Sequence, residues 1–275
     1  MAIIIDALKL GSKPIQSRFS RPSKSVSNAR IIDEETISRY RPGGYHPVRL
    51  GDVFKNGKYR IIGKLGYGVC STVWLASDME TKRHVALKIL TADSFGKGKD
   101  TFELAIMKYM KGHVAEAPGR SHILGLLNSF GHTGPNGKHV CLVTKPMGPD
   151  LSILREEFPT PRLPVPLIKN ISKQLLHALA YLHDQSGVIH TDIMSKNILI
   201  ETPAINRMFD ELPSEAFKPD LLPLAPSNDF YMQSEQVSWA QEDLKVSKDI
   251  PQAGPTTTYL TVLTIYPDAG KPHGE

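Results

Sequence analysis

The stretch HTDIMSKN, residues 190–197, decides how the rest of this sequence is interpreted. It follows an apolar run, LIKNISKQLLHALAYLH, whose spacing predicts a long helix. Asp192 supplies a carboxylate that can accept a proton, and Asn197 supplies a side-chain carbonyl that can hold a divalent cation. We expect His190 to support the loop from the core. Asp192 alone would equally suit a turn, so the surrounding motifs must decide between a turn residue and a catalytic carboxylate.

Two motifs upstream contain residues suited to binding phosphate groups. LGYGVCSTV, residues 65–73, follows a predicted strand, and Gly66 and Gly68 let a backbone approach phosphates without an intervening Cβ. VALKIL places Lys88 in an apolar strand, and Glu103 on the next predicted helix is well placed to hold its ammonium. A plain hairpin turn, an edge-strand lysine and a surface glutamate would explain each motif taken alone. Their order and spacing together favour a phosphate-binding site.

The predicted elements divide the chain into a strand-rich half and a helix-rich half, which indicates an α+β fold. Strands are predicted at 59–65, 71–77, 84–90, 122–132 and 138–146, and helices at 100–112, 149–158 and 164–184. The helix at 100–112 is expected to bury Phe102, Ile106, Tyr109 and Met110 and to end at Gly112. The helix at 164–184 is expected to bury Ile168, Ile171, Leu175, Leu179 and Leu182.

Composition excludes several classes of protein. No apolar run approaches the ~20 residues of a membrane span. Two cysteines, Cys70 and Cys141, cannot form a disulfide framework and indicate a reducing compartment. The net charge of +5 is uneven: residues 1–39 carry +3 and residues 201–275 carry −7, so the middle carries +9. A basic middle suits a polyphosphate or an acidic partner, or else an ordinary solvated surface.

The two ends of the chain look unlike the middle. Residues 1–39 are basic and serine-rich, which predicts a disordered tail or, as the alternative, a mitochondrial transit peptide. Residues 201–275 contain nine prolines and no clear period, so irregular structure is expected there.

These motifs resemble those of eukaryotic protein kinases, and more narrowly of the SR-protein kinase group and its fungal relatives. The residues that carry the likeness are YRPGGYHPVRLGDVFKNGKYRIIGKLGYGVCSTVWLASD, HVALKIL, GKHVCLVTKPMG and HTDI. The resemblance covers residues 40–200, with a small lobe at 40–144 that contains one helix and an incomplete helical large lobe at 145–200. Beyond residue 200 it gives out, as if the large lobe were cut short inside an insert.

The resemblance implies a Ser/Thr kinase that uses ATP and Mg²⁺. Asp192 would be the catalytic base, Lys88 and Glu103 the phosphate-holding pair, and Asn197 a metal ligand. The base of ATP would lie between the lobes, against the linker 145–148. The residues implied to contact ATP are Leu65, Gly66, Gly68, Val73, Ala86, Lys88, Thr144 and Met147. A protein Ser/Thr substrate, no membrane, no direct nucleic acid, and a cytoplasmic or nuclear location are also implied.

The sequence departs from the kinase pattern in two places. Met194 stands where a catalytic-loop lysine is expected, and loss of such a cation can lower a rate by roughly 10²–10³. No clear Asp-Phe-Gly follows the loop: Asp229-Phe230 is followed by Tyr231, which lacks the conformational freedom of glycine. The alternatives are therefore an active kinase, a non-catalytic kinase-like module that binds nucleotide or protein, and an incomplete product that folds poorly. A bare apolar face on the helix 164–184 is also expected.

Overall fold

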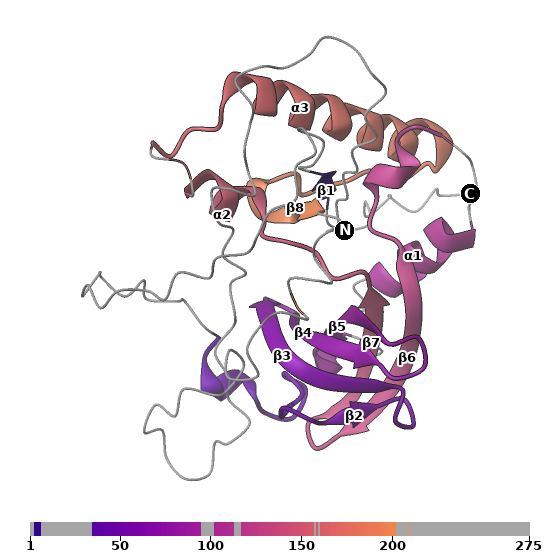
Figure 1. The fold of residues 1–275 in the computed structure, drawn as a ribbon. Coiled ribbons are helices and arrows are strands. Elements are labelled where there is room, and N and C mark those ends of the chain that lie inside the picture. Colours follow the sequence, from indigo (N-terminus) through magenta and orange to yellow (C-terminus); the bar gives the residue numbers. More distant parts are fainter. Residues whose placement is uncertain are drawn as a thin grey trace, which may run out of the picture.

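The computed structural model describes residues 35–94, 102–112, 117–156, 158, 160–201 and 209, and the backbone of Ile3–Asp6. Statements about structure below refer to these residues. A six-stranded antiparallel sheet forms one lobe, and the other contains two helices and a two-stranded sheet (Figure 1). The linker from β7 to α2 joins them.

The large sheet has the strand order β2-β3-β4-β5-β7-β6. The strands are β2 Val53–Phe54, β3 Tyr59–Gly68, β4 Ser71–Asp78, β5 Arg83–Leu90, β6 Leu126–Gly134 and β7 Gly137–Thr144. The predicted strands at 59–65, 71–77, 84–90 and 138–146 are confirmed. The strand predicted at 122–132 begins only at Leu126, because a 3₁₀ turn, η3 Arg120–His122, precedes it.

The helix α1, Glu103–Gly112, ends at the predicted glycine, and the face expected to be buried is only partly right: Met110 is buried and Ile106 is half-buried, as predicted. Met107 and Met110 are buried, whereas Phe102 and Tyr109 are each 50% exposed. Phe102 lies before the helix with φ 53°, so it does not share the helical period. Glu103, Met107 and Met110 are spaced by four and three residues and therefore lie on one face. The side of α1 that packs inward is thus the side that carries Glu103.

The second lobe contains α2 Leu151–Glu156, α3 Val165–Ala180 and a π turn at Tyr181–Gln185. Asp150 caps α2, since its Oδ1 accepts hydrogen bonds from the Ser152 N–H at 2.8 Å and the Ile153 N–H at 3.1 Å. The strand β8, Ile198–Glu201, follows the 3₁₀ turn η5, Ser195–Asn197. β8 pairs in parallel with β1, Ile3–Asp6, with Ile3 opposite Ile198.

The apolar face predicted for α3 is partly wrong. Ile171 and Leu182 are buried, and Leu175 and Leu179 are half-buried, but Ile168 is 44% exposed. Gln174 and Ala178 take buried places, because they share the inward face with Ile171 at a spacing of three and four residues. Val165 and Leu176 are 64% and 66% exposed, which agrees with the expected bare apolar face on this helix.

The expectation of a disordered tail at 1–39 does not hold for two short parts. Ile3–Asp6 forms β1, and residues 35–39 are folded onto the large sheet through the buried Glu35 and the 3₁₀ turn η1, Ile37–Arg39. The transit-peptide alternative concerns residues outside the described ones. The irregular region predicted at 201–275 also lies outside them, apart from Glu201 and Phe209.

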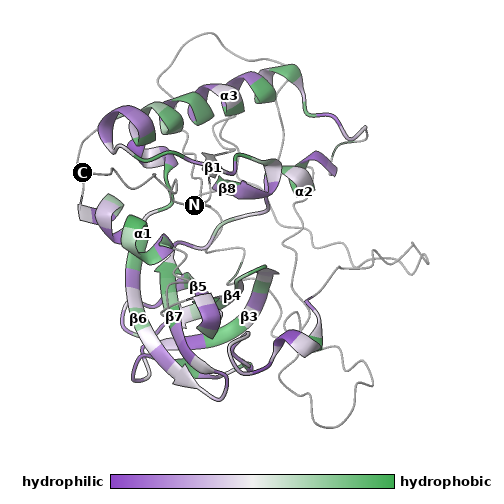
Figure 2. Cartoon of the chain, turned by 180° about the vertical axis from the view of Figure 1, so that it is seen from behind, coloured by the Kyte–Doolittle hydropathy of each residue, from purple (hydrophilic) through white to green (hydrophobic). Residues whose placement is uncertain are grey.

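Two large clusters of buried side chains organise the lobes. Hydrophobic and hydrophilic residues alternate along the helices and strands that contribute to them (Figure 2). One lies within the sheet and includes Trp74, Leu87 and Val143. The other runs from α1 and β7 to α3 and β8, and it includes Met107, Leu142, Ile171, Leu182, Ile198 and Ile200. This second cluster crosses from one lobe to the other, so burial of apolar surface helps to fix their relative position.

Candidate active site

An ion pair joins the sheet to α1. The Lys88 Nζ on β5 lies 2.6 Å from Oε1 and 2.9 Å from Oε2 of Glu103. Burial by itself raises the pKa of Glu103, but the Lys88 ammonium outweighs it and holds that pKa below its usual value. The Lys88 side chain keeps 30% exposure and that of Glu103 13%. The Lys88 ammonium is therefore held by the Glu103 carboxylate and remains partly exposed to solvent.

The register of the sheet gathers most of the predicted nucleotide-binding residues. Val73 on β4 pairs with Lys88 on β5, and Ala86 pairs with Thr144 on β7. Cross-strand partners in an antiparallel sheet project from the same face, and Ala86 and Lys88 are two residues apart on one strand. Val73, Ala86, Lys88 and Thr144 therefore share one face. Val73 also pairs with Gly66, which places the glycine-rich turn at the edge of that face.

The glycine-rich turn is the tip of the β3–β4 hairpin. Gly68 pairs with Ser71 across it, and Leu65 lies just before it on β3. A Cβ built on Gly66 would meet nothing within 4 Å, so open space adjoins the backbone at this glycine. No described side chain covers the backbone at Gly66, so the approach of a ligand to this glycine stays a prediction that the geometry allows.

The loop at 190–197 is held by its own side chains. The Asn197 Nδ2 donates hydrogen bonds to the Asp192 backbone carbonyl and to its Oδ2, both at 2.9 Å. The buried His190 accepts a hydrogen bond at Nδ1 from the Asp192 N–H at 3.1 Å, which agrees with its predicted supporting role. Because Nδ2 is bound to Asp192, the Asn197 Oδ1 is the atom left to hold a cation. Met194 is 45% exposed, and Lys196 is also exposed.

The linker and the loop are tied together through β8. Gly148 donates its N–H to the Ile200 carbonyl at 2.8 Å, and Ile200 donates to the Pro149 carbonyl at 3.0 Å. Lys145 pairs with Glu201 at 3.2 Å. The linker that contains Met147 therefore runs beside the strand that leaves the catalytic loop, so the two halves of the candidate site belong to neighbouring segments.

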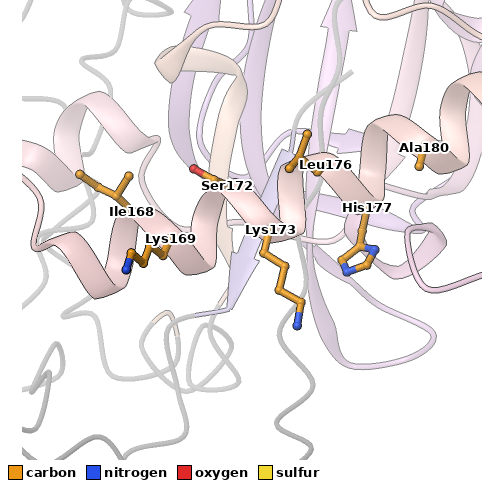
Figure 3. Close-up of a pocket in the computed structure, with 7 residues that line it drawn as sticks. All are labelled: Ile168, Lys169, Ser172, Lys173, Leu176, His177 and Ala180. Carbon is orange, nitrogen blue, oxygen red and sulfur yellow. The ribbon is translucent and has the colours of Figure 1, made fainter.

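A groove lies elsewhere, along the outer side of α3 (Figure 3). Its lining residues are Ile168, Lys169, Ser172, Lys173, Leu176, His177 and Ala180. None of the predicted site residues lines this groove, so it is distinct from the candidate active site.

Comparisons with known proteins identify the family of the chain. The model of the protein kinase domain matches residues 59–210. This chain belongs to the protein kinase family. Among curated proteins, Saccharomyces cerevisiae serine/threonine-protein kinase SKY1 is 40% identical over 198 residues, which cover 71% of this chain and 27% of that protein.

Two further relatives are also named as protein kinases. The Schizosaccharomyces pombe protein kinase dsk1 is 40% identical over 64% of this chain and 32% of its own length. Human SRSF protein kinase 3 is 41% identical over 61% of this chain and 30% of its own length. The matched part of this kinase thus spans about a third or less of each of these relatives.

The residues present are compatible with the ATP and Mg²⁺ that protein kinases generally use. Lys88 can meet phosphate oxygens, and Val73 and Ala86 offer an apolar face for a base. Within the described residues, no cluster of three or more His, Cys, Asp or Glu could hold a metal. Asn197 offers a side-chain carbonyl in the described loop, an oxygen of the kind that Mg²⁺ accepts beside waters and phosphate oxygens. Asp229 lies outside the described residues.

One set of contacts was not anticipated from the sequence. Arg39 and Tyr45, in the segment before the sheet, donate hydrogen bonds to backbone carbonyls of the glycine-rich turn. The only sequence signal was the YRPGGYHPV lead-in, which marked family membership without indicating a contact.

Proposed function

We propose that this kinase transfers a phosphoryl group from Mg-ATP to a serine or threonine hydroxyl of a protein. The observation that supports it most is the Lys88–Glu103 pair at 2.6 Å in a sheet whose register aligns Val73, Ala86 and Thr144 on one face. The relatives named as serine/threonine kinases support the same chemistry. The protein substrate and a cytoplasmic or nuclear location are parts of this proposal. No helix among the described residues is long and apolar enough to cross a membrane.

In this proposal the sheet holds the nucleotide. Leu65 and Val73 cover the base from one side, Ala86 lines its site, and Thr144 and Met147 border it at the linker. Lys88 donates to the α- and β-phosphates, and Glu103 holds the ammonium in position so that it need not reorganise when ATP binds. Gly66 and Gly68 allow the turn to close over the phosphates.

The loop performs the proton chemistry. Asp192 accepts the proton of the substrate hydroxyl, and Asn197 fixes the carboxylate of Asp192 through the 2.9 Å hydrogen bond to Oδ2. When bound, Mg²⁺ neutralises phosphate charge, and the Asn197 Oδ1 would hold it. Met194 supplies no cation to the transferring group, so we expect a slower transfer than a lysine at this position would give.

A second candidate function is that of a non-catalytic module that binds nucleotide. The departure at Met194 favours it, because a site that only binds ATP does not need the loop cation. Both candidates require the sheet face around Lys88. They differ in whether Asp192 takes part in a reaction.

Purified chain with ATP, Mg²⁺ and a basic serine-containing peptide separates the two. We expect phosphate transfer that falls by about 10²–10⁴ in Asp192→Asn, with ATP affinity changed less than about twofold. Asp184→Asn, an exposed carboxylate on the turn after α3, is the matched control and should leave transfer unchanged. Saturable ATP binding with no transfer by the unmodified chain would refute the kinase reaction and favour the binding module.

A further inference from the structure

The segment before the sheet folds around the outside of the glycine-rich turn. We name Glu35, Arg39, Tyr40 and Tyr45 the clasp. Tyr45 is 1% exposed, its ring lies 5.4 Å from that of Tyr40, and the Arg39 guanidinium lies 4.7 Å from the Tyr45 ring centroid. These contacts pack three of the four side chains against one another.

The clasp reaches the tip of the β3–β4 hairpin at two backbone carbonyls. The Tyr45 hydroxyl donates to the Gly68 carbonyl at 2.7 Å, and the Arg39 guanidinium donates to the Val69 carbonyl. Burial raises the pKa of Tyr45, so its hydroxyl keeps the proton that it donates. Two successive peptide groups of the turn are therefore held from outside the hairpin.

The clasp is itself anchored at both ends. Glu35 accepts hydrogen bonds from the Lys64 Nζ on β3 at 2.6 and 2.8 Å, and from the Tyr40 hydroxyl at 2.5 Å. At the other end, the Asn136 Nδ2 in the β6–β7 turn donates to the Tyr45 carbonyl at 2.6 Å. The loop between is tight: Gly43 has φ +84°, and a Cβ on Gly44 would collide with the Arg39 carbonyl. The clasp is thus built on rigid parts of the sheet.

Holding these carbonyls also fixes the amide groups on the other side of the peptide planes. In a trans peptide the C=O and the following N–H point in opposite directions. The Gly68 carbonyl sets the direction of the Val69 N–H, and the Val69 carbonyl sets that of the Cys70 N–H. Both N–H groups therefore point away from the clasp. Backbone N–H groups of this kind are what a glycine-rich turn offers to phosphate oxygens.

We propose that Tyr45 and Arg39 are positioning residues that hold the Val69 and Cys70 amides oriented for the terminal phosphates of ATP. The inference rests on the proposed nucleotide site and deepens it, because it assigns a role to the YRPGGYHPV lead-in. Tyr45 and Arg39 touch the turn and not the ligand. Their effect should therefore depend on the phosphates and not on the base.

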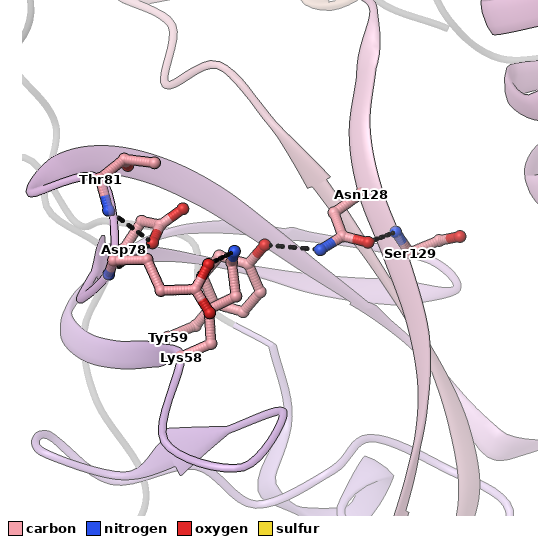
Figure 4. A network of polar contacts seen from close by, with 7 residues as sticks. Lys58, Tyr59, Asp78, Thr81, Asn128 and Ser129 are labelled. Carbon is pink, nitrogen blue, oxygen red and sulfur yellow. Dashed lines mark hydrogen bonds and ion pairs between the residues drawn. The ribbon is translucent and has the colours of Figure 1, made fainter.

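The test compares Tyr45→Phe with Tyr59→Phe. Both tyrosines are buried, and each hydroxyl makes one hydrogen bond near 2.8 Å, but Tyr59 accepts its bond from the Asn128 Nδ2, away from the turn (Figure 4). Loss of one such bond corresponds to about a three- to tenfold change in an equilibrium. We expect Tyr45→Phe to weaken Mg-ATP binding by about that factor while adenosine binding stays unchanged. Tyr59→Phe should change neither.

Amide hydrogen exchange of the free protein provides a second measurement that needs no nucleotide. Exchange at residues 68–70 should accelerate in Tyr45→Phe and in Arg39→Met, but not in Tyr59→Phe. Equal loss of ATP and adenosine affinity, or no acceleration at 68–70, would overturn the inference. If the unmodified chain binds no ATP, the proposed function fails, and the exchange result still decides whether the clasp orders the turn.

Discussion

The buried pair between Glu35 and Lys64 allows a sharp test of how the clasp is held. Both side chains are 0% exposed, and the Lys64 Nζ lies 2.6 and 2.8 Å from the two Glu35 oxygens. Glu35→Gln keeps the shape and an acceptor but removes the negative charge. The Lys64 ammonium would then stay buried and lose the charge of Glu35. Breaking a buried pair in this way costs about 3–5 kcal/mol.

Such a loss would be a large share of the whole stability, since small folded proteins unfold with about 5–15 kcal/mol. With roughly 2–4 °C per kcal/mol for a chain of this size, the melting temperature should fall by about 6–20 °C. The assay is thermal and urea unfolding followed by circular dichroism. The double variant Glu35→Leu with Lys64→Met should recover much of the loss, because it removes both charges from the interior.

The matched control is Glu80→Gln, which removes the partner of Lys58 in an exposed pair where Glu80 is 65% exposed. That substitution should change the melting temperature little or not at all, since solvent screens the pair. A Glu35→Gln variant that melts within about 2 °C of Glu80→Gln would refute the reasoning that charge burial anchors the clasp.

Three further outcomes are expected. Burial, with help from the neighbouring His132 and His139, lowers the pKa of His46 to about 3, whereas an unfolded histidine titrates near 6.5. As the pH falls, the unfolded chain therefore binds a proton at His46 before the folded chain does. This group alone should lower the free energy of unfolding by about 2 kcal/mol between pH 7.5 and pH 5. His46→Gln should make the free energy of unfolding less dependent on pH in this range. The exposed apolar side chains of α3 should bind a hydrophobic dye or drive self-association. Leu176→Glu should lower dye binding and change the free energy of unfolding by less than about 0.5 kcal/mol. Ile171→Ala, at a buried site on the same helix, should lower the free energy of unfolding by about 2–5 kcal/mol. Glu103→Gln should weaken ATP binding and slow transfer by about tenfold or more, because Lys88 loses the charge that positions it, and an unchanged rate would contradict the role of the pair.

Local sequence signals predicted the strands and the loop well. Short sequence patterns were enough to locate the glycine-rich hairpin, the strand around Lys88 and the H-x-D-x-x-x-x-N loop. No knowledge of the tertiary structure was needed for these three elements. The pairing of Lys88 with Glu103 was expected from the kinase pattern and is present at 2.6 Å. The catalytic and ligand-binding roles of these residues stay predictions until the experiments above are done.

Helix faces were harder to predict than helix positions. On α1, Tyr109 was expected inside and is exposed, while Met107 is buried. On α3, Ile168 was expected inside and is exposed, while Gln174 is buried. Apolar residues occur on more than one side of each helix. The helical spacing of these residues therefore does not fix which side faces the core. Packing against the neighbouring elements decides which side is turned inward.

The sequence by itself determined the family and the positions of most strands of the large sheet, because those depend on motifs of at most a few tens of residues. Only the tertiary structure decided that Glu35 would meet Lys64, that Tyr45 would reach the Gly68 carbonyl, and that β1 would pair with β8. The first two contacts join residues 29 and 23 positions apart, and the third joins strands from opposite ends of the described chain. No local propensity encodes such pairs, because they depend on the burial of charge and on the completion of backbone hydrogen bonds between distant segments.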